Sequence, residues 1–285
     1  MISQATRGSR RRIKNQITRF ICYLVLIFGA FCMLLPFIWM LSTSFKDISD
    51  VFIYPPKLLG ETFVWKNYTK LSERLSFFSM LKNTIWVTVA VVIGQLATSS
   101  MAGFAFAFLK FPGRERIFSV YLIALMIPFH VLLVPTFTLL RDLKLLNSLW
   151  ALILPCLVTP FGAFLMRQCF LSLPGALAEA AKIDGCTPWG VFQRIYLPLS
   201  IPSMTTLGIF TFVGTWNDFL RPLIFLSSNK QMTLTLGIYA MQGNYATDWG
   251  ILMATVTMSL LPVVILFLCV QDLFVEGIAL SGMKA

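Results

Sequence analysis

The chain has 285 residues, of which 57% are hydrophobic and 12% are charged, and its formal net charge at pH 7 is +11. Soluble domains average about 25% charged residues, so this composition excludes an ordinary water-soluble domain and predicts a protein with several membrane crossings. The basic residues flank apolar runs, which favours retention on the cytoplasmic side of a membrane over nucleic-acid binding.

The N-terminal segment, 1–19, carries six basic residues and no acidic residue, so it is predicted to stay in the cytoplasm. The first apolar run is too long for the core of a secretory signal and has no small-residue cleavage site, so it is predicted to remain uncleaved. Apolar runs predict six membrane-spanning helices, at about 20–43, 83–109, 117–140, 147–170, 199–225 and 249–270. These spans make 20–270 one transmembrane domain and place both termini, including the tail 271–285, in the cytoplasm.

The longest weakly apolar interruption in the second half of the chain is 172–202, between the fourth and fifth predicted spans. Residues 176–183 predict a short helix, and Gly185 follows where a left-handed C-terminal cap is easiest to form. Ala180 and Ala181 offer a smooth patch that another surface can approach closely. The pattern predicts a small cytoplasmic helix displayed for another protein. The alternative is an amphipathic helix lying in the membrane interface.

The predicted fifth span contains a polar string, TWNDFLRP, at 215–222. Unpaired Asp218 and Arg221 would be costly in lipid, so each is expected to face a cavity, a partner or the external interface. Because they are three residues apart, they can pair on one helical face.

No enzymatic chemistry is predicted for this chain. It has no G-x-x-x-x-G-K-[ST] loop for ATP phosphates, and its single histidine, His130, has no partners at helical spacing. The six cysteines lack paired spacing, so neither a metal site nor a disulfide framework is expected. The chain is predicted to have no cofactor of its own.

The string Glu179-Ala180-Ala181, followed by Asp184-Gly185, resembles the E-A-A-x-x-x-G loop of bacterial ABC-importer permeases. The Leu-Pro-Leu run at 197–199 extends the match. The resemblance implies that these five residues belong to a coupling helix, within a loop at 172–198, which docks in a cleft of the ATPase subunit. Glu179 is then expected to pair with a basic residue of that cleft.

Trp216, Asn217, Asp218 and Phe219 resemble the W-N-D-F-x-x-P-L string of carbohydrate-class permeases. The resemblance implies a polar part of the translocation pathway, with Trp216 or Phe219 stacking on sugar rings. Helix packing with interfacial anchoring is the alternative.

The tail, with QDLFVEGI at 271–278 and GMKA at 282–285, resembles the terminus of the smaller permease subunit of sugar importers. That likeness implies contact of Glu276, Gly277 and Lys284 with the ATPase dimer. Met283 and Ala285 depart from the family's usual residues, and a disordered end is the alternative.

Together these strings make the chain resemble the smaller permease subunit of maltose-type, binding-protein-dependent ABC importers, over nearly all residues after Arg19. Lys144 is a departure, because the family usually has glycine there. The resemblance implies an all-α, six-span type I importer fold in the bacterial inner membrane. The implied partners are a homologous second permease, two subunits that bind ATP and magnesium, an extracytoplasmic solute-binding protein and a carbohydrate.

Two alternatives to an importer subunit remain open. A secondary carrier would need intramembrane charge pairs or broken helices in matching halves, and a non-transport scaffold would not need the Glu179 loop. The sequence leaves the carbohydrate open among disaccharides, longer or acidic oligosaccharides and sugar phosphates.

Overall fold

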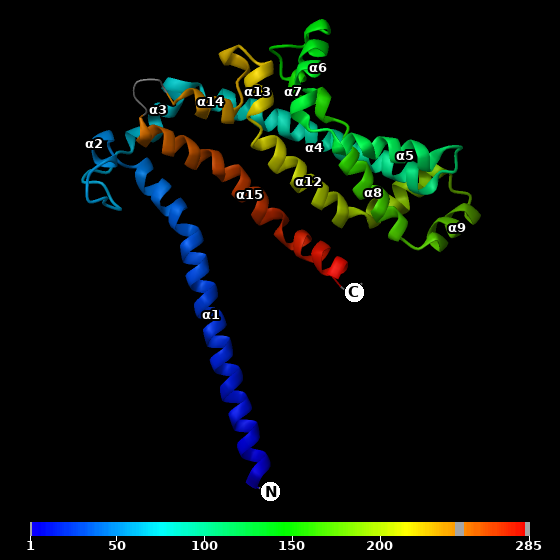
Figure 1. The fold of residues 1–285 in the computed structure, drawn as a ribbon, viewed down its shortest axis with the longest axis horizontal. Coiled ribbons are helices and arrows are strands. Elements are labelled where there is room, and N and C mark those ends of the chain that lie inside the picture. Colours follow the sequence, from blue (N-terminus) through cyan, green and yellow to red (C-terminus); the bar gives the residue numbers. More distant parts are fainter. Residues whose placement is uncertain (1, 243–247, 283–285) are drawn as a thin grey trace. The chain divides into compact units, whose positions relative to one another are not determined.

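The computed structural model describes residues 2–242 and 248–282, and side chains at 15–71, 76–242 and 248–271 (Figure 1). Within these residues all regular structure is helical. This agrees with the all-α prediction, because a helix pairs its own backbone groups where lipid offers no partners. The chain divides into two compact units, Met1–Glu73 with Asn244–Met258, and Arg74–Gly243 with Ser259–Ala285.

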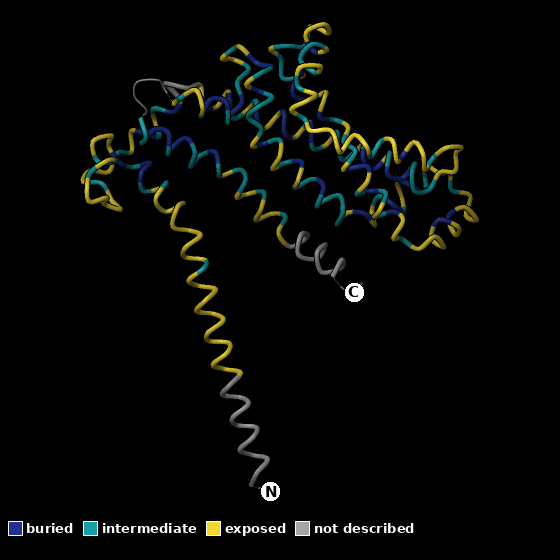
Figure 2. The backbone as a smooth tube through the Cα atoms, viewed as in Figure 1, coloured by how far each residue is buried: buried dark blue, intermediate teal, exposed yellow. Residues whose placement is uncertain are grey.

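The first unit contains α1 (Ile2–Ser44), α2 (Ile48–Val51), most of α3 (Lys66–Leu75) and the start of α15 (Trp249–Gly282). Nearly all described side chains of α1 are exposed, as Figure 2 shows, except those close to its C-terminal end. There Asn67 Nδ2 donates hydrogen bonds to the carbonyls of Ser44 and Lys46, at 3.0 and 2.9 Å. Asn67 therefore fastens α3 to the end of α1.

The second unit is built around α4 (Phe77–Phe108), against which α8 (Pro160–Ser172) and α12 (Ile201–Trp216) pack (Figure 1). A glycine permits a close approach of α4 and α8. A Cβ atom at Gly103 would lie 2.6 Å from Met166 Cβ and 2.8 Å from the backbone nitrogen of Arg167. Small residues of this kind are typical of contacts between membrane helices.

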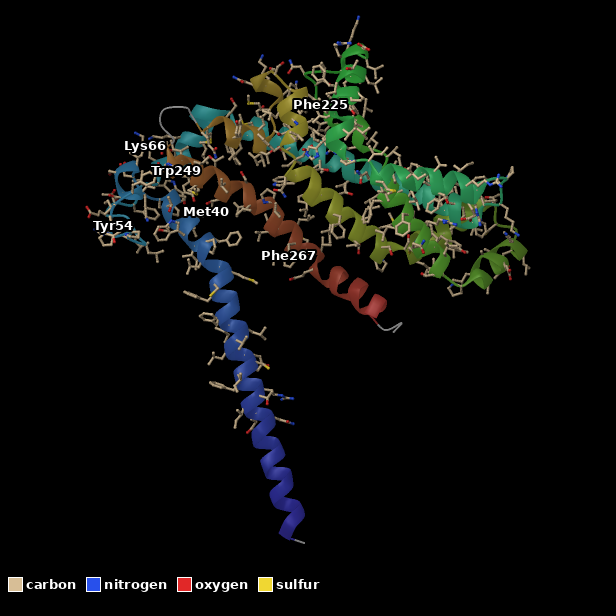
Figure 3. The ribbon with its side chains drawn as sticks, viewed as in Figure 1. Met40, Tyr54, Lys66, Phe225, Trp249 and Phe267 are labelled. Atoms are coloured by element: carbon tan, nitrogen blue, oxygen red, sulfur yellow. The ribbon has the colours of Figure 1, made fainter. Side chains whose placement is uncertain are left out.

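The remaining elements of this unit are short. They are α5 (Arg114–Ile123), η1 (Ala124–Met126), α6 (Phe129–Asp142), α7 (Trp150–Ile153), η2 (Leu154–Cys156), α9 (Gly175–Ile183), α10 (Pro188–Val191), the π-helix η3 (Phe192–Tyr196), α11 (Leu197–Leu199), α13 (Leu220–Phe225), η4 (Asn229–Gln231) and α14 (Leu234–Ala240). One apolar core joins α4, α7, α13 and α14, and contains the buried Phe225 labelled in Figure 3. A second core lies beneath α9.

Among the described residues, three stretches are unbroken helices long and apolar enough to cross a membrane: Asn15–Ser44, Phe77–Phe108 and Trp249–Gln271. The count rises to six if each of three bent helix pairs is one span. These pairs are Arg114–Met126 with Phe129–Asp142, bent by 100°, Trp150–Cys156 with Pro160–Ser172, bent by 40°, and Pro188–Leu199 with Ile201–Trp216, bent by 75°.

The helices expected at 117–140, 147–170 and 199–225 are each interrupted, and in the last of them α12 ends at Trp216 and α13 starts at Leu220. Proline explains part of the break. Pro222 has no N–H with which to bond the carbonyl of Asp218 in a continuing helix. That carbonyl instead accepts a hydrogen bond of 2.7 Å from Thr235 Oγ1.

The break before α8 is stabilised by side chains of α4. Gln95 Nε2 donates to the carbonyl of Cys156 at 2.7 Å, and Thr98 Oγ1 donates to that of Leu157 at 2.6 Å. Thr211 Oγ1 of α12 donates in turn to Gln95 Oε1 at 2.8 Å. Irregular backbone at membrane depth needs such partners, so these bonds account for a broken helix between two apolar segments.

Candidate functional site

The predicted helix around Glu179 is present as α9, Gly175–Ile183, within a segment of residues 172–200 that we call the α9 loop. The backbone N–H of Cys186 donates to the carbonyl of Ala181, and that of Gly185 to the carbonyl of Lys182, at 2.9 and 3.0 Å. These two bonds form a Schellman motif, and Gly185 has the positive φ of 79° that the motif requires. The predicted glycine cap is therefore confirmed.

The two faces of α9 differ sharply in exposure. Ala178 and Ala181 are only 2% and 5% exposed and face the interior of the unit. Glu179 and Ala180 are exposed, and Ile183 at the end of the helix is 86% exposed. The two alanines of the motif therefore do not form one outward patch, because Ala180 faces outward and Ala181 lies against the protein.

Five aromatic rings lie beneath α9, and we call them the ring cluster: Phe104 and Phe108 of α4, Phe170 of α8, and Phe192 and Tyr196 of the π-helix. The ring centroid of Phe104 lies 5.1 Å from that of Phe192 and 5.5 Å from that of Tyr196. The same core contains Ala178 and Ala181. Since such rings pack rigidly, α9 packs on a rigid cluster to which α4, α8 and the π-helix all contribute.

The chain returns from α9 to α12 through a series of short helices. Thr187 caps α10, since its hydroxyl accepts a hydrogen bond from the Gly190 N–H at 3.2 Å. A π-turn follows, in which the Leu197 N–H bonds to the carbonyl of Phe192. Pro198 comes next and lacks an N–H, which favours a local departure from α-helical bonding. The helical segment up to Leu199 then meets α12 at 75°.

The side chains of the polar string at 215–222 differ in their exposure and in their packing partners. Trp216, the last residue of α12, is 4% exposed, and its ring stacks on that of Phe212 with centroids 5.4 Å apart. The Phe219 ring packs on Tyr239 at 4.9 Å. Asn217 is exposed, and its Nδ2 donates to the carbonyl of Val213 at 2.9 Å. Both aromatic rings thus have partners within the chain, while the Asn217 amide faces outward.

Asp218 and Arg221 form the expected ion pair, with Oδ2 and Nη1 3.2 Å apart. The guanidinium of Arg221 also lies 4.4 Å above the Phe129 ring. A cavity of about 10 Å³ adjoins Asp218 and is lined by Cys156 and Thr233 among others. Because this volume is that of about one water molecule, this cavity is too small to hold a sugar.

The tail residues expected to contact an ATPase cannot be placed. Glu276 and Gly277 belong to the backbone of α15, but the Glu276 side chain lies outside the described residues, and Lys284 lies wholly outside them. In the part of the chain with described side chains, no three His, Cys, Asp or Glu residues come together as metal ligands. The α9 loop, in which an exposed helix packs on buried aromatic rings, is therefore the candidate functional site.

A family model described as "Binding-protein-dependent transport system inner membrane component" matches residues 95–279. The chain is 36% identical over 264 residues to the arabinooligosaccharides transport system permease protein AraQ of Halalkalibacterium halodurans, covering 90% of this chain and 93% of that protein. It is 30% identical to the lactose transport system permease protein LacG of Rhizobium radiobacter, over 93% of this chain and 96% of LacG.

The sn-glycerol-3-phosphate transport system permease protein UgpE of Yersinia pestis is 31% identical, with coverage of 90% and 94%. A solved bacterial ABC transporter for import of the acidic polysaccharide alginate has a chain of similar fold. Its TM-score is 0.80 at 22% identity, covering 91% of this chain and 97% of that one. A second structure of an alginate transporter, in complex with a periplasmic protein bound to an alginate pentasaccharide, matches with a TM-score of 0.65 at 14% identity.

Proposed function

The chain belongs to the family of binding-protein-dependent transport system inner membrane components, and from this membership we propose that it is the permease subunit of a carbohydrate importer driven by ATP. It is a multi-pass inner-membrane protein. Family membership leaves the secondary carrier and the scaffold without support. The observation that carries the proposal is the α9 loop, in which an outward Glu179 stands over a buried ring cluster.

In the proposed importer both termini and the α9 loop lie in the cytoplasm, where α9 docks into a cleft of an ATP-binding subunit. Two such subunits bind ATP and magnesium, and a homologous second permease completes the pathway. The positive net charge of segment 1–19 supports this orientation. A solute-binding protein on the external side delivers the sugar. The periplasmic protein in the complex with the similar alginate transporter supports that partner.

The chain's own part in the cycle is mechanical. Glu179 and Ala180 are exposed to a partner, while Ala178 and Ala181 bear on the ring cluster. A displacement of α9 is therefore passed to Phe104 of α4 and Phe170 of α8, since a close-packed cluster transmits strain. In the family motif, Glu179 and Ala180 thus form the outward side that contacts the ATPase, and Ala181 belongs to the inward side that moves the spans.

The proposed substrate class is a carbohydrate, because relatives at 30–36% identity are named for arabinooligosaccharides, lactose and sn-glycerol 3-phosphate. Among the four proposed pathway residues, Asn217 has the exposed side chain. Its Oδ1 is free to accept a hydrogen bond from a sugar hydroxyl while Nδ2 stays on the Val213 carbonyl. Trp216 and Phe219 support this position from within.

The test of the proposal is Glu179→Lys in the assembled importer, measured as sugar uptake and ATP hydrolysis in proteoliposomes. Charge reversal at a docking contact should lower uptake by about tenfold or more, as truncating a contact charge can cost 2–5 kcal/mol. The matched control is Glu61→Lys, which reverses another exposed glutamate, on the loop after α2, and should leave uptake unchanged. Normal uptake by the Glu179 variant would contradict the docking role.

A further inference from the structure

Arg167, on α8, joins three helices through one guanidinium. Its Nη2 lies 2.8 and 2.7 Å from the two carboxylate oxygens of Glu115, in the first turn of α5. Its Nε donates to the carbonyl of Phe106, on α4, at 3.1 Å. Its central carbon lies 4.1 Å from the centroid of the Phe118 ring, also on α5. We call this set the Arg167 clamp.

The clamp is a main attachment of α5 to the rest of its unit. Phe118 is the buried residue of this ten-residue helix, and its ring lies 5.1 Å from that of Phe106. Other apolar side chains of α5, such as Ile117 and Val120, are exposed. The guanidinium of Arg167 covers the one ring that α5 buries and holds the one carboxylate that α5 carries.

A second arginine closes the turn that connects α4 to α5. Arg114 Nε donates to Glu115 Oε1 at 3.0 Å, and its Nη1 donates to the Leu109 carbonyl at 3.1 Å. Glu115 is therefore shared by an arginine of its own helix and an arginine of α8. The Arg114 bonds are local, so the link between α5 and α8 depends on Arg167.

The position of Arg167 connects this link to the α9 loop. Arg167 is on the last turns of α8, which ends at Ser172, just before α9 begins at Gly175. Phe170, between Arg167 and that end, belongs to the ring cluster beneath α9. A force applied to α9 thus reaches α8 at Phe170, and Arg167, less than one turn earlier on α8, links that helix to α5.

We propose that Arg167 is a positioning residue that makes α5 follow α8 when α9 is displaced, so that the third and fourth predicted spans shift together during transport. This inference rests on the proposed function. It adds to that function a residue outside the coupling motif and outside the sugar pathway. Without the clamp, α9 can still be driven by the ATPase, but α5 keeps only its contacts with α4 and follows α8 less closely.

The first experiment measures the coupling ratio, sugar taken up per ATP hydrolysed, for Arg167→Met in the importer reconstituted in proteoliposomes. Methionine keeps apolar contact with Phe118 but loses the ion pair and the bond to Phe106. The ratio should fall about tenfold while ATP hydrolysis persists, a loss of the size that residues along a coupling network produce. A wild-type ratio would overturn the proposal.

Two further variants separate positioning from folding. The Glu115 side chain is 61% exposed and that of Arg167 is 11% exposed. Glu115→Gln therefore changes the exposed partner and keeps an amide oxygen that accepts a hydrogen bond from Arg167, so the variant should assemble normally. Its ratio should fall in the same direction, by about threefold, within the range for such networks. The charge swap Glu115→Arg with Arg167→Glu should recover part of the ratio. If Glu115→Gln assembles and keeps the wild-type ratio, the proposal is wrong.

The matched control is Arg141→Met. Arg141 also forms an ion pair, at 3.0 Å, but with its sequence neighbour Asp142 on the same helix, α6. Removal of this pair breaks no link between helices, so the coupling ratio should stay at the wild-type value. An equal loss in Arg141→Met and Arg167→Met would show a general effect of losing an arginine and would overturn the positioning role.

A distance measurement tests the clamp without using uptake. Spin labels at two exposed positions, Val120 of α5 and Leu171 of α8, report the separation of these helices in nanodiscs by pulsed electron paramagnetic resonance. The distance distribution should be narrow in the parent chain and broader in Arg167→Met, with or without ATP. Identical distributions overturn the clamp, whereas normal uptake by Glu179→Lys overturns the proposed function, so the two failures are distinguishable.

Discussion

The α9 loop and the string at 215–222 both place polar residues between apolar helices, but they arrange them in opposite ways. In the α9 loop a complete helix keeps Glu179 outside and Ala181 inside. At 215–222 the helix stops at Trp216, the ring turns inward onto Phe212, and Asn217 is left outside. Where a helix continues through a motif, the helical period determines which side chains face outward and which face inward. Where a helix ends within a motif, the conformation of its last residues determines this instead.

The arrangement at the end of α12 predicts the largest effect. Trp216→Ala removes a buried ring and should lower the free energy of unfolding in detergent by about 3–5 kcal/mol, the cost typical of a large cavity. Asn217→Ala, one residue away, loses a local bond on an exposed side chain and should change stability by less than about 1 kcal/mol. Uptake should nevertheless fall in the Asn217 variant. Equal stability losses in both variants would erase the contrast between these positions.

Substitution of two adjacent alanines compares an inward with an outward position on α9 in the same way. Ala181→Asp buries a carboxylate against the ring cluster and should cost about 2–3 kcal/mol in unfolding free energy. Ala180→Asp points to solvent and should cost about 0.7 kcal/mol, its helix propensity alone. Thermal unfolding of the purified subunit measures both. If the order is reversed, the assignment of the two faces is wrong.

The two regions also differ in which groups hydrogen-bond to the backbone at their helix ends. Substitution of Gln95 tests this difference. The end of α9 uses its own backbone, but the breaks among the spans depend on side chains such as Gln95, which bonds to both the Cys156 carbonyl and Thr211. Gln95→Leu leaves those groups unpaired and should cost about 1–3 kcal/mol. Gln193→Leu changes an exposed glutamine and should stay within about 0.5 kcal/mol.

The smallest effect is expected at two capping positions with the same geometry. Lys144 occupies the Schellman position after α6, with φ of 57°, as Gly185 does after α9. Lys144→Gly should therefore stabilise the chain by about 1 kcal/mol, because it relieves a left-handed residue of its Cβ clash. Gly185→Ala should destabilise it by about 1 kcal/mol, since the surrounding space is open and only the backbone conformation opposes it. Opposite signs in thermal unfolding confirm the comparison.

Local signals in the sequence predicted α9 and its glycine cap, because a cap depends on a few adjacent residues. The breaks in the spans were harder, because prolines do not reveal which of them ends a helix. Pro36 and Pro135 lie inside helices, while α6 begins after Pro128 and α8 begins at Pro160. Whether a proline ends a helix depends on whether another helix donates hydrogen bonds to the carbonyls that the break leaves unpaired. Those donors are brought into place by the tertiary fold and not by the local sequence.

The ring cluster and the Arg167 clamp could not be predicted at all. Phe104 meets Tyr196 across 92 positions, and Arg167 meets Glu115 across 52. Neither pair has a local pattern, since aromatic residues and single charges occur throughout the chain. The motif located the exposed helix α9, but the residues beneath it are determined by the packing of α4 against α8.

In the first unit, nearly all described side chains of α1 are exposed. The 18 most apolar consecutive residues of Asn15–Ser44 include none that is buried. Within its own unit this helix is covered only near its C-terminal end, so the rest of its apolar surface suits lipid and it is long enough to cross a bilayer by itself.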